Sequence, residues 1–338
     1  MSENLINENI YLFLFLSFLT FILLTIYKKI SLRLKLLDNP SKDNIHKFPT
    51  PTGAGIVFSI IILSISLLKY YSNFFDSYGE LNRFYLFIIT ILIYTIMCFY
   101  DDFKQMHVLT KFCFQVILVY IALPLLVINT DLNIIKIIPL KLLMLILIIS
   151  WIYIINIHNF IDGLDGFLTL HSLSFFLVNL IIFFYSDIQN FNFFISLIFS
   201  AILLPFLFFN KPQAKLFMGD TGSVLIGFAI GLVTLSNIFT NIWHVYIILL
   251  AYPVLDVTLT LFKKVYKRKY LWERLFDYFF LKPVLTYKKS HNWVFKRFMI
   301  YNLFNFLNAL ISYFYDLKAL VILSIFGSFY LLYIFSKK

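Results

Sequence analysis

The most regular feature of the sequence is a succession of long apolar runs separated by short polar segments. Eleven runs approach or reach the ~20 residues that an α-helix needs to cross a bilayer. They lie near 10–27, 54–70, 84–100, 109–128, 138–157, 167–185, 191–209, 221–238, 242–262, 298–315 and 318–335. The pattern predicts an all-α polytopic integral membrane protein with about 11 transmembrane helices (10–11). The last two runs could instead form one re-entrant hairpin, since only Asp316 and Lys318 separate them.

Composition agrees with this pattern. Hydrophobic residues make up 61% of the chain and charged residues 13%, against about 25% charged in a soluble domain, so a soluble fold is excluded. The same figures exclude disorder, a coiled coil and a disulfide-stapled scaffold. Cys98 and Cys113 both lie in apolar runs, so we expect core thiols.

The basic residues predict orientation. Twenty-three of the 28 Lys and Arg residues lie in five alternate segments, 28–53, 101–111, 210–220, 263–297 and 336–338. The positive-inside rule places these segments in the cytoplasm, with the N-terminus outside and the C-terminus inside. No Lys or Arg precedes the first run, which we therefore expect to be retained as a helix. Basic residues report topology here, and no nucleic-acid partner is expected.

Acidic residues gather at the ends of apolar runs. Five carboxylates form three clusters: Asp101 with Asp102, Asp162 with Asp165, and Asp220. Two apolar runs separate each acidic cluster from the next. Two runs also lie between the Pro/Gly turn 49–55 and the first cluster, and two between the last cluster and the basic loop 263–297. All of these features should therefore meet at the cytoplasmic face.

Oxygen ligands at one membrane face suit a hard cation such as Mg²⁺, with Mn²⁺ as an alternative. Mg²⁺ is usually held by one or two carboxylates together with substrate phosphates, and Lys and Arg of the loops would neutralise phosphate charge. The segment Gly219–Ser223 opens a run, so its free N–H groups could face an anion. Together these features favour phosphoryl transfer between a lipid phosphate and a soluble nucleotide.

Each cluster also has a plainer interpretation. Asp101 and Asp102 could occupy a solvated loop, Asp162 and Asp165 a simple turn, and Asp220 a helix N-cap. The basic charge of 263–269 could be ordinary positive-inside charge.

Two further groups of residues have structural interpretations. We expect interfacial positions for some histidines and core positions for others; these are His46, His107 and His158, and then His171 and His244. One helical face within 271–285 is apolar, which predicts an amphipathic helix on the membrane surface. That face comprises Trp272, Leu275, Phe276, Phe279 and Phe280.

Four motifs follow one another along the chain. They are Asp38-Asn39-Pro40 with His46-Lys47 and 49–55, then Asp101-Asp102 with Lys111 and Gln115, then 156–166 with Asn159, Asp162 and Asp165, then 210–223 with Asn210 and Asp220. With these motifs, the chain from about Asp38 to His291 resembles the polyprenyl-phosphate N-acetylhexosamine-1-phosphate transferases, bacterial enzymes that initiate O-antigen, teichoic acid and peptidoglycan lipid intermediates.

The resemblance implies one transmembrane transferase domain over 1–338 in the bacterial inner (plasma) membrane. The reaction transfers a sugar-1-phosphate from a UDP-N-acetylamino sugar to undecaprenyl phosphate and releases UMP. Asp101, Asp102 and Asp220 would be catalytic and would hold Mg²⁺, with Asp220 as the principal ligand and Asn210 nearby. As an alternative to holding the metal, Asp101 and Asp102 would deprotonate the lipid phosphate.

The resemblance also implies a set of substrate-binding residues. Asn159, Asp162 and Asp165 would hold the uridine side. Lys47, Thr52, Lys111, Asn210 and His291 complete the set. Direct attack by the lipid phosphate is favoured over a covalent enzyme intermediate, and a homodimer is left open.

The last loop departs from the family pattern. Many members carry a His-x-His-His cluster there, whereas this chain keeps only His291. The segment 290–293 and the stretch beginning at Asp256 look more like the branch that starts O-antigen chains with 6-deoxy-N-acetyl sugars. This leaves the sugar undetermined and disfavours a sugar-pentapeptide donor.

Two other functions fit the sequence less well. A carrier or flippase for a lipid-linked or anionic solute should place ionisable residues near the midplane and show internal repeats. The acids instead lie at run ends and no repeat is evident, which disfavours a carrier. An inactive scaffold is disfavoured by the presence of all five carboxylates and Asn210.

Overall fold

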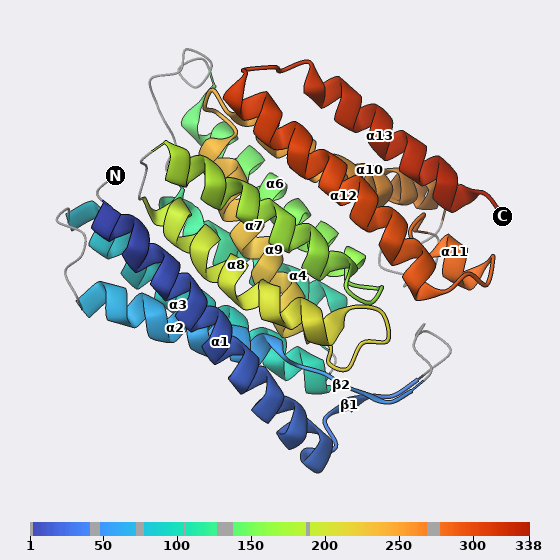
Figure 1. The fold of residues 1–338 in the computed structure, drawn as a ribbon, viewed down its shortest axis with the longest axis horizontal. Helices are drawn as coiled ribbons and strands as arrows, with labels where there is room; N and C mark the ends of the chain where they lie inside the picture. The colour runs from blue at the N-terminus through green and yellow to red at the C-terminus, as the bar shows by residue number, and fades with distance from the viewer. Residues whose placement is uncertain are drawn as a thin grey trace.

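Long helices lying side by side form nearly all of the described structure, a computed structural model that describes residues 3–40, 48–71, 78–104, 106–126, 138–186, 190–268 and 278–338 (Figure 1). Within these ranges eleven long α-helices coincide with the eleven predicted runs. They are α1 (Glu3–Leu34), α2 (Gly55–Tyr71), α3 (Tyr78–Lys104), α4 (Val108–Ala122), α6 (Leu140–Ile161), α7 (Phe167–Tyr185), α8 (Phe191–Asn210), α9 (Gly219–Asn237), α10 (Trp243–Tyr266), α12 (His291–Phe314) and α13 (Leu320–Ser336).

Short elements join some of these helices. β1 (Leu37–Asp38) pairs antiparallel with β2 (Thr50–Pro51), which places Leu37 opposite Pro51. A 3₁₀ turn, η1 (Leu123–Leu125), extends α4, and α11 (Lys282–Leu285) precedes α12.

The helices are those of a multi-pass membrane protein. Eight of the described helices are long and apolar enough to cross a bilayer, while α2 and α13 are apolar but shorter. The remaining long helix, α12, has 24 residues but is more polar, since its sequence includes Asn302, Asn305 and Asn308. The all-α membrane fold is therefore confirmed, and the number of crossings stays a prediction.

The centre of the bundle is α9, which packs against α2, α3, α6, α7 and α8 and is buried at each residue from 221 to 237. Small residues allow this burial, because they let helix backbones approach closely. A Cβ added at Gly227 would lie 2.8 Å from Ile155 Cα, and one added at Gly231 would lie 2.3 Å from Trp151 Cδ1. α9 thus fixes the position of every helix around it.

One end of the bundle brings together segments that are distant in sequence. The turn after β2 lies against the segment preceding α9, where Phe217 N donates to Pro51 O at 2.8 Å and Gly55 N donates to Met218 O at 2.9 Å. The N-terminus lies at the opposite end of the bundle from the C-terminus, as Figure 1 shows. Backbone hydrogen bonds therefore fix the Pro/Gly turn beside the start of α9.

The predicted loop 263–297 is shorter than expected at both ends. α10 continues to Tyr266 and α12 already begins at His291, where Ser290 Oγ accepts from Trp293 N at 3.2 Å as an N-cap. Of the predicted surface helix, Trp272, Leu275 and Phe276 lie outside the described residues. Phe279 and Phe280 lie in a turn and are buried in the protein, so their predicted membrane contact is wrong.

The burial predicted for individual histidines and cysteines is confirmed at some positions and wrong at others. His171 and His244 are buried as predicted. The interfacial position predicted for His158 is wrong, since its side chain is fully buried and its ring stacks on that of His171 with centroids 5.4 Å apart. Cys98 is a buried free thiol as predicted, whereas Cys113 is exposed on α4.

Candidate active site

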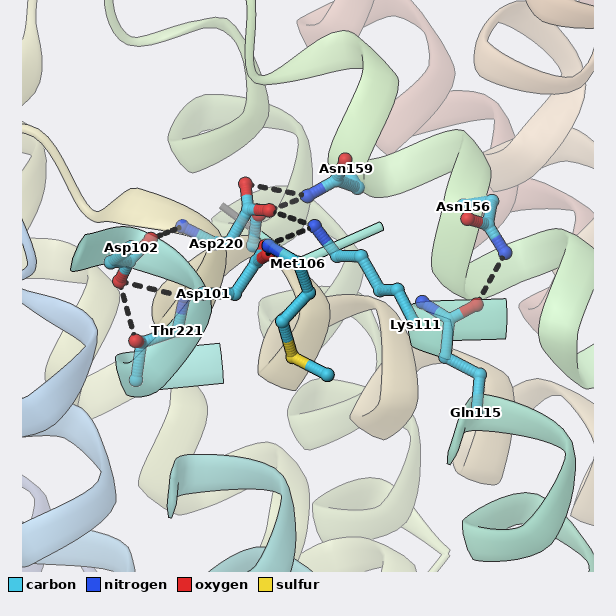
Figure 2. A network of polar contacts seen from close by, with 10 residues as sticks. Asp101, Asp102, Met106, Lys111, Gln115, Asn156, Asn159, Asp220 and Thr221 are labelled. Carbon is cyan, nitrogen blue, oxygen red and sulfur yellow. Dashed lines mark hydrogen bonds and ion pairs between the residues drawn. The ribbon is translucent and has the colours of Figure 1, made fainter. Parts of the chain in front are cut away.

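The centre of the polar site is an ion-pair network between three elements. The ammonium of Lys111, at the start of α4, contacts Asp101 Oδ2 at the end of α3 and Asp220 Oδ2 at the start of α9 (Figure 2). Asp101 Oδ1 also accepts a 2.7 Å hydrogen bond from Met106 N, which closes the turn between α3 and α4. Two carboxylates that are 119 positions apart in the sequence therefore share one cation.

The last turn of α6 completes this network. Asn159 Nδ2 donates to Asp220 Oδ1 at 3.1 Å and to Ser223 Oγ at 2.9 Å. Both oxygens of Asp220 thus have a donor, and the amide oxygen of Asn159 is not engaged by either of these bonds. The predicted meeting of the Asp101, Asn159 and Asp220 segments is confirmed.

Asp102 has a different function in the fold from its neighbour Asp101. Its Oδ1 accepts from Asp220 N at 2.7 Å, and its Oδ2 accepts from Thr221 Oγ1 at 2.6 Å and Thr221 N at 3.3 Å. These bonds cap the N-terminus of α9 from another helix, and the charge complements the helix dipole. The expectation that these N–H groups are free for a substrate anion is therefore wrong at Asp220 and Thr221.

Gly219 is required beside this cap. Its φ is +71°, and a Cβ there would lie 2.8 Å from Asp102 Oδ2. The Gly-Asp-Thr sequence thus lets α9 start directly against the carboxylate of Asp102.

A second network surrounds Asp165, in the turn between α6 and α7. Asp165 Oδ2 accepts from the backbone N–H groups of Gln213 at 3.1 Å and Ala214 at 3.3 Å, and His291 Nδ1 lies 3.2 Å away. The remaining histidine of the last loop therefore meets the predicted nucleotide segment. This contact brings the end of α6 and the start of α12 together.

Asn210, at the end of α8, ties the same turn to the loop before α9. Its Oδ1 accepts from Gly166 N at 3.1 Å and Thr169 Oγ1 at 2.7 Å, while its Nδ2 donates to Leu216 O at 3.2 Å. The side chain is buried and engaged on both polar atoms. Asn210 stabilises the loops on either side of the site. None of these hydrogen bonds joins it to the Asp220 carboxylate, near which it was expected.

The surroundings of Asp162 oppose the ionisation of its carboxyl group. Burial, and next the negative charges of Asp220, Asp102 and Asp165, raise its pKa well above the ordinary value. A cationic ligand arriving near these acids would favour its ionised form. The site thus carries unbalanced negative potential on the side of the α6–α7 turn.

Thr52, a predicted substrate residue, takes no part in these networks. Thr52 lies in the turn beside the α9 start, where its carbonyl accepts from Tyr27 OH at 2.9 Å. Lys47 lies outside the described residues.

Two participants were not among the predicted catalytic or substrate-binding residues. Ser223 Oγ accepts from Asn159 Nδ2, and Thr221 donates to Asp102. Gln115, which belongs to the second motif, accepts from Asn156 Nδ2 at 3.0 Å through its Oε1. The spacing of Asp220 and Ser223 by three positions on one helix face was the available indication.

The donor set fits a hard divalent cation. Asp101 and Asp220 offer carboxylate oxygens that already converge on a positive charge, and hard oxygen ligands are those of Mg²⁺. Within the described ranges no three His, Cys, Asp or Glu side chains form a metal cluster. Asp101 and Asp220 face Lys111, whereas Asp102 is turned onto α9. The role of Asp101, Asp102 and Asp220 as metal ligands stays a prediction.

Comparison with known proteins agrees with the motifs. Residues 84–238 match the family model of Glycosyl transferase family 4. The chain is 25% identical over 315 residues, covering 88% of this chain and 79% of the relative, to a probable undecaprenyl-phosphate N-acetylglucosaminyl 1-phosphate transferase of Bacillus subtilis (strain 168).

Two further relatives are named phospho-N-acetylmuramoyl-pentapeptide-transferase. That of Prochlorococcus marinus subsp. pastoris is 30% identical over 319 residues, which cover 83% of this chain and 85% of the relative. That of Staphylococcus epidermidis is 28% identical over 299 residues, which cover 81% and 88%. The carboxylate network, the family match and these relatives agree, and the chain belongs to the polyprenyl-phosphate N-acetylhexosamine-1-phosphate transferases of glycosyl transferase family 4, a family of membrane phosphotransferases.

Proposed function

We propose that this protein transfers an N-acetylamino-sugar-1-phosphate from a UDP-sugar to undecaprenyl phosphate and releases UMP. One observation carries the proposal. Asp101, Lys111, Asn159 and Asp220, from four separate helices, form one network at one end of the bundle. Such a network has the positive and negative groups that phosphoryl transfer requires at a membrane interface.

The bonds that change can be stated in full. An oxygen of the lipid phosphate attacks the β-phosphorus of the UDP-sugar, and the bond from that phosphorus to the oxygen bridging the α- and β-phosphorus breaks. The electron pair of that bond leaves with UMP. The lipid phosphate is already an anion, so the protein's main contribution is positioning and charge stabilisation.

The residues divide between the two substrates. Lys111 would neutralise phosphate oxygens once it leaves its carboxylate partners, and Asp101 would face the lipid phosphate. Asn159, Asp162 and Asp165 would hold the uridine side, with His291 at the diphosphate. Asn210 and Asp102 would maintain the loops and the start of α9.

We propose Mg²⁺, with Mn²⁺ as an alternative, as the cofactor held by Asp220 and Asp101. When bound, it would neutralise charge that develops on the diphosphate. The hardness of the two carboxylates and the lack of a thiol in the networks described above support this choice.

The donor and setting are proposed from the last loop and the charge pattern. A UDP-N-acetyl sugar without a peptide is favoured because His291 is the one histidine of the usual cluster in this chain. The clustering of basic residues supports an active site on the cytoplasmic face of the bacterial plasma membrane. The step would begin a cell-surface polysaccharide of the O-antigen kind.

The test is UMP release by purified protein in detergent with undecaprenyl phosphate, Mg²⁺ and a panel of UDP-N-acetyl sugars, including a UDP-sugar-pentapeptide. Release should require lipid phosphate, should stop with EDTA, and should fall by at least about 10³-fold in Asp220→Asn. Glu8→Gln, which changes an exposed carboxylate of α1, is the matched control. Folded protein that releases no UMP with any donor would contradict the proposal and favour the carrier.

A further inference from the structure

A buried carboxylate outside the networks described above lies in the middle of α10. Asp256 has no exposed surface, and four donors surround its two oxygens. Tyr252 OH donates to Oδ2 at 2.8 Å, and Thr260 Oγ1 lies 3.4 Å from Oδ1, each one turn away on the same helix. A buried charge needs such compensation, so these donors explain how the helix tolerates the residue but not why it is there.

The other two donors belong to a different segment. Phe279 N donates to Asp256 Oδ1 at 2.9 Å and Phe280 N donates to Oδ2 at 3.1 Å. The carboxylate therefore binds two consecutive backbone amides of the chain that returns toward α12. Lys263 Nζ and Lys282 Nζ also lie over the ring of Phe279, at 3.8 and 4.0 Å from its centroid. The segment 278–281 is thereby fixed to α10.

This segment in turn contacts both sides of the α6–α7 turn. The ring of Tyr278 stacks on Phe160 in the last turn of α6, with centroids 5.8 Å apart. The ring of Phe280 stacks on Phe167, the first residue of α7, with centroids 5.0 Å apart. Between them, a Cβ added at Gly163 would lie 3.7 Å from atoms of both Phe280 and Leu281.

We infer that Asp256 is a positioning residue for the α6–α7 turn, the turn that carries Asp162 and Asp165. It holds segment 278–281 through two amides, and that segment holds the turn through Tyr278 and Phe280. Segment 278–281 also leads along the chain to His291, which contacts Asp165. Resting on the proposed function, the inference assigns Asp256 to the binding of the UDP-sugar and not of the lipid phosphate.

The test compares Asp256→Asn with a matched control on the same helix, Tyr246→Phe. The control removes a buried 2.7 Å hydrogen bond from α10 to Asn179 of α7. Asp256→Asn places an amide donor beside N–H donors, so one backbone amide loses its acceptor. We expect the KM for the UDP-sugar to rise about tenfold while the KM for undecaprenyl phosphate stays within about twofold. Tyr246→Phe should leave both KM values unchanged.

A second measurement does not depend on activity. Peptide-resolved hydrogen exchange should become faster in 278–281 and also in 162–166 of Asp256→Asn, while exchange in the centre of α9 stays unchanged. A uniform loss of folded protein would lower kcat and leave both KM values as they are. Unchanged exchange at 162–166, or equal effects on the two KM values, would overturn the inference. Failure of the wild-type protein to release UMP would instead count against the proposed function.

Discussion

Consecutive residues of an α-helix point about 100° apart, so the side chains of Asp101 and Asp102 leave α3 in different directions. The structure gives each its own partners: Lys111 and Met106 for the first, Asp220 and Thr221 for the second. A motif of two adjacent acids therefore combines a charge-bearing group with a helix cap. The predicted run 84–100 ends before this pair, so the division depends on the continuation of α3 to Lys104 and was not predicted.

Lys111 occupies the place between Asp101 and Asp220 where a divalent cation would find its carboxylate ligands. Lys111→Met removes the competing charge, so the affinity for Mn²⁺ in the absence of substrates should rise by about fivefold or more. Transfer should nevertheless fall by about 10²-fold, because a donor to the phosphates is lost. Mn²⁺ titration followed by electron paramagnetic resonance measures the first effect.

Lys104→Met is the control, since that lysine is exposed near the end of α3 and lies over Tyr100. It should change neither quantity. Weaker Mn²⁺ binding in Lys111→Met would show that the lysine does not compete with the cation.

The raised pKa of Asp162 makes stability depend on pH. The unfolded carboxyl ionises near its ordinary pKa of about 3.9, whereas the folded carboxyl keeps its proton to higher pH. Above that ordinary value the folded state binds more protons, so the free energy of unfolding falls as pH rises toward the folded pKa. Asp162→Asn lacks this loss, and its Tm relative to wild type should increase between pH 5 and pH 8.

Thermal unfolding in EDTA, without nucleotide, gives the comparison at each pH. Glu8→Gln, which removes an exposed carboxylate of α1, is measured alongside as the control for loss of a surface charge. A difference for Asp162→Asn that does not change with pH would mean that the carboxyl is ionised throughout.

At the scale of elements, the start of α9 depends on an acid from α3. Asp102→Asn keeps the shape but loses the charge and one acceptor, so the free energy of unfolding should fall by about 1 kcal/mol. Mn²⁺ affinity should change little, because the carboxylate faces α9. Asp220→Asn should show the reverse, with a large loss of Mn²⁺ binding. Equal losses of Mn²⁺ affinity in the two variants would make Asp102 a metal ligand.

The positions of the helices could be predicted from the apolar runs, because each run is long and ends in polar residues. The last loop could not, because α12 begins seven residues before its apolar run, at the Ser290 cap. Phe279 and Phe280 fit an amphipathic pattern, yet Asp256 binds their amides and draws them into the core. A contact between residues so far apart in the chain produces no periodic pattern in the sequence.

Which residues meet could also be predicted in part. The even number of runs between acidic clusters placed Asp101, Asn159 and Asp220 at one end, as observed. The direction of each side chain could not be predicted, since it depends on helix rotation set by the small residues of α9. Asn210 and His158 are examples, because both turn inward to partners on neighbouring helices.

At the scale of the whole molecule, the charge pattern predicts that the C-terminus and the site end lie in the cytoplasm. A green fluorescent protein fused after Lys338 should fluoresce, and alkaline phosphatase fused there should be inactive. Alkaline phosphatase fused after Thr240, between α9 and α10, should be active. The opposite pattern would invert the orientation and place the carboxylate network outside the cell.

The central claim is that a sugar-phosphate, and not a sugar alone, moves to the lipid. It is tested most directly with UDP-N-acetylglucosamine, or the best donor of the panel, labelled with ³²P at either the α- or the β-phosphorus. The account predicts β-label in the butanol-extracted lipid and α-label in UMP, both dependent on Asp220. Both labels remaining together in UDP, or β-label released as free phosphate, would contradict it.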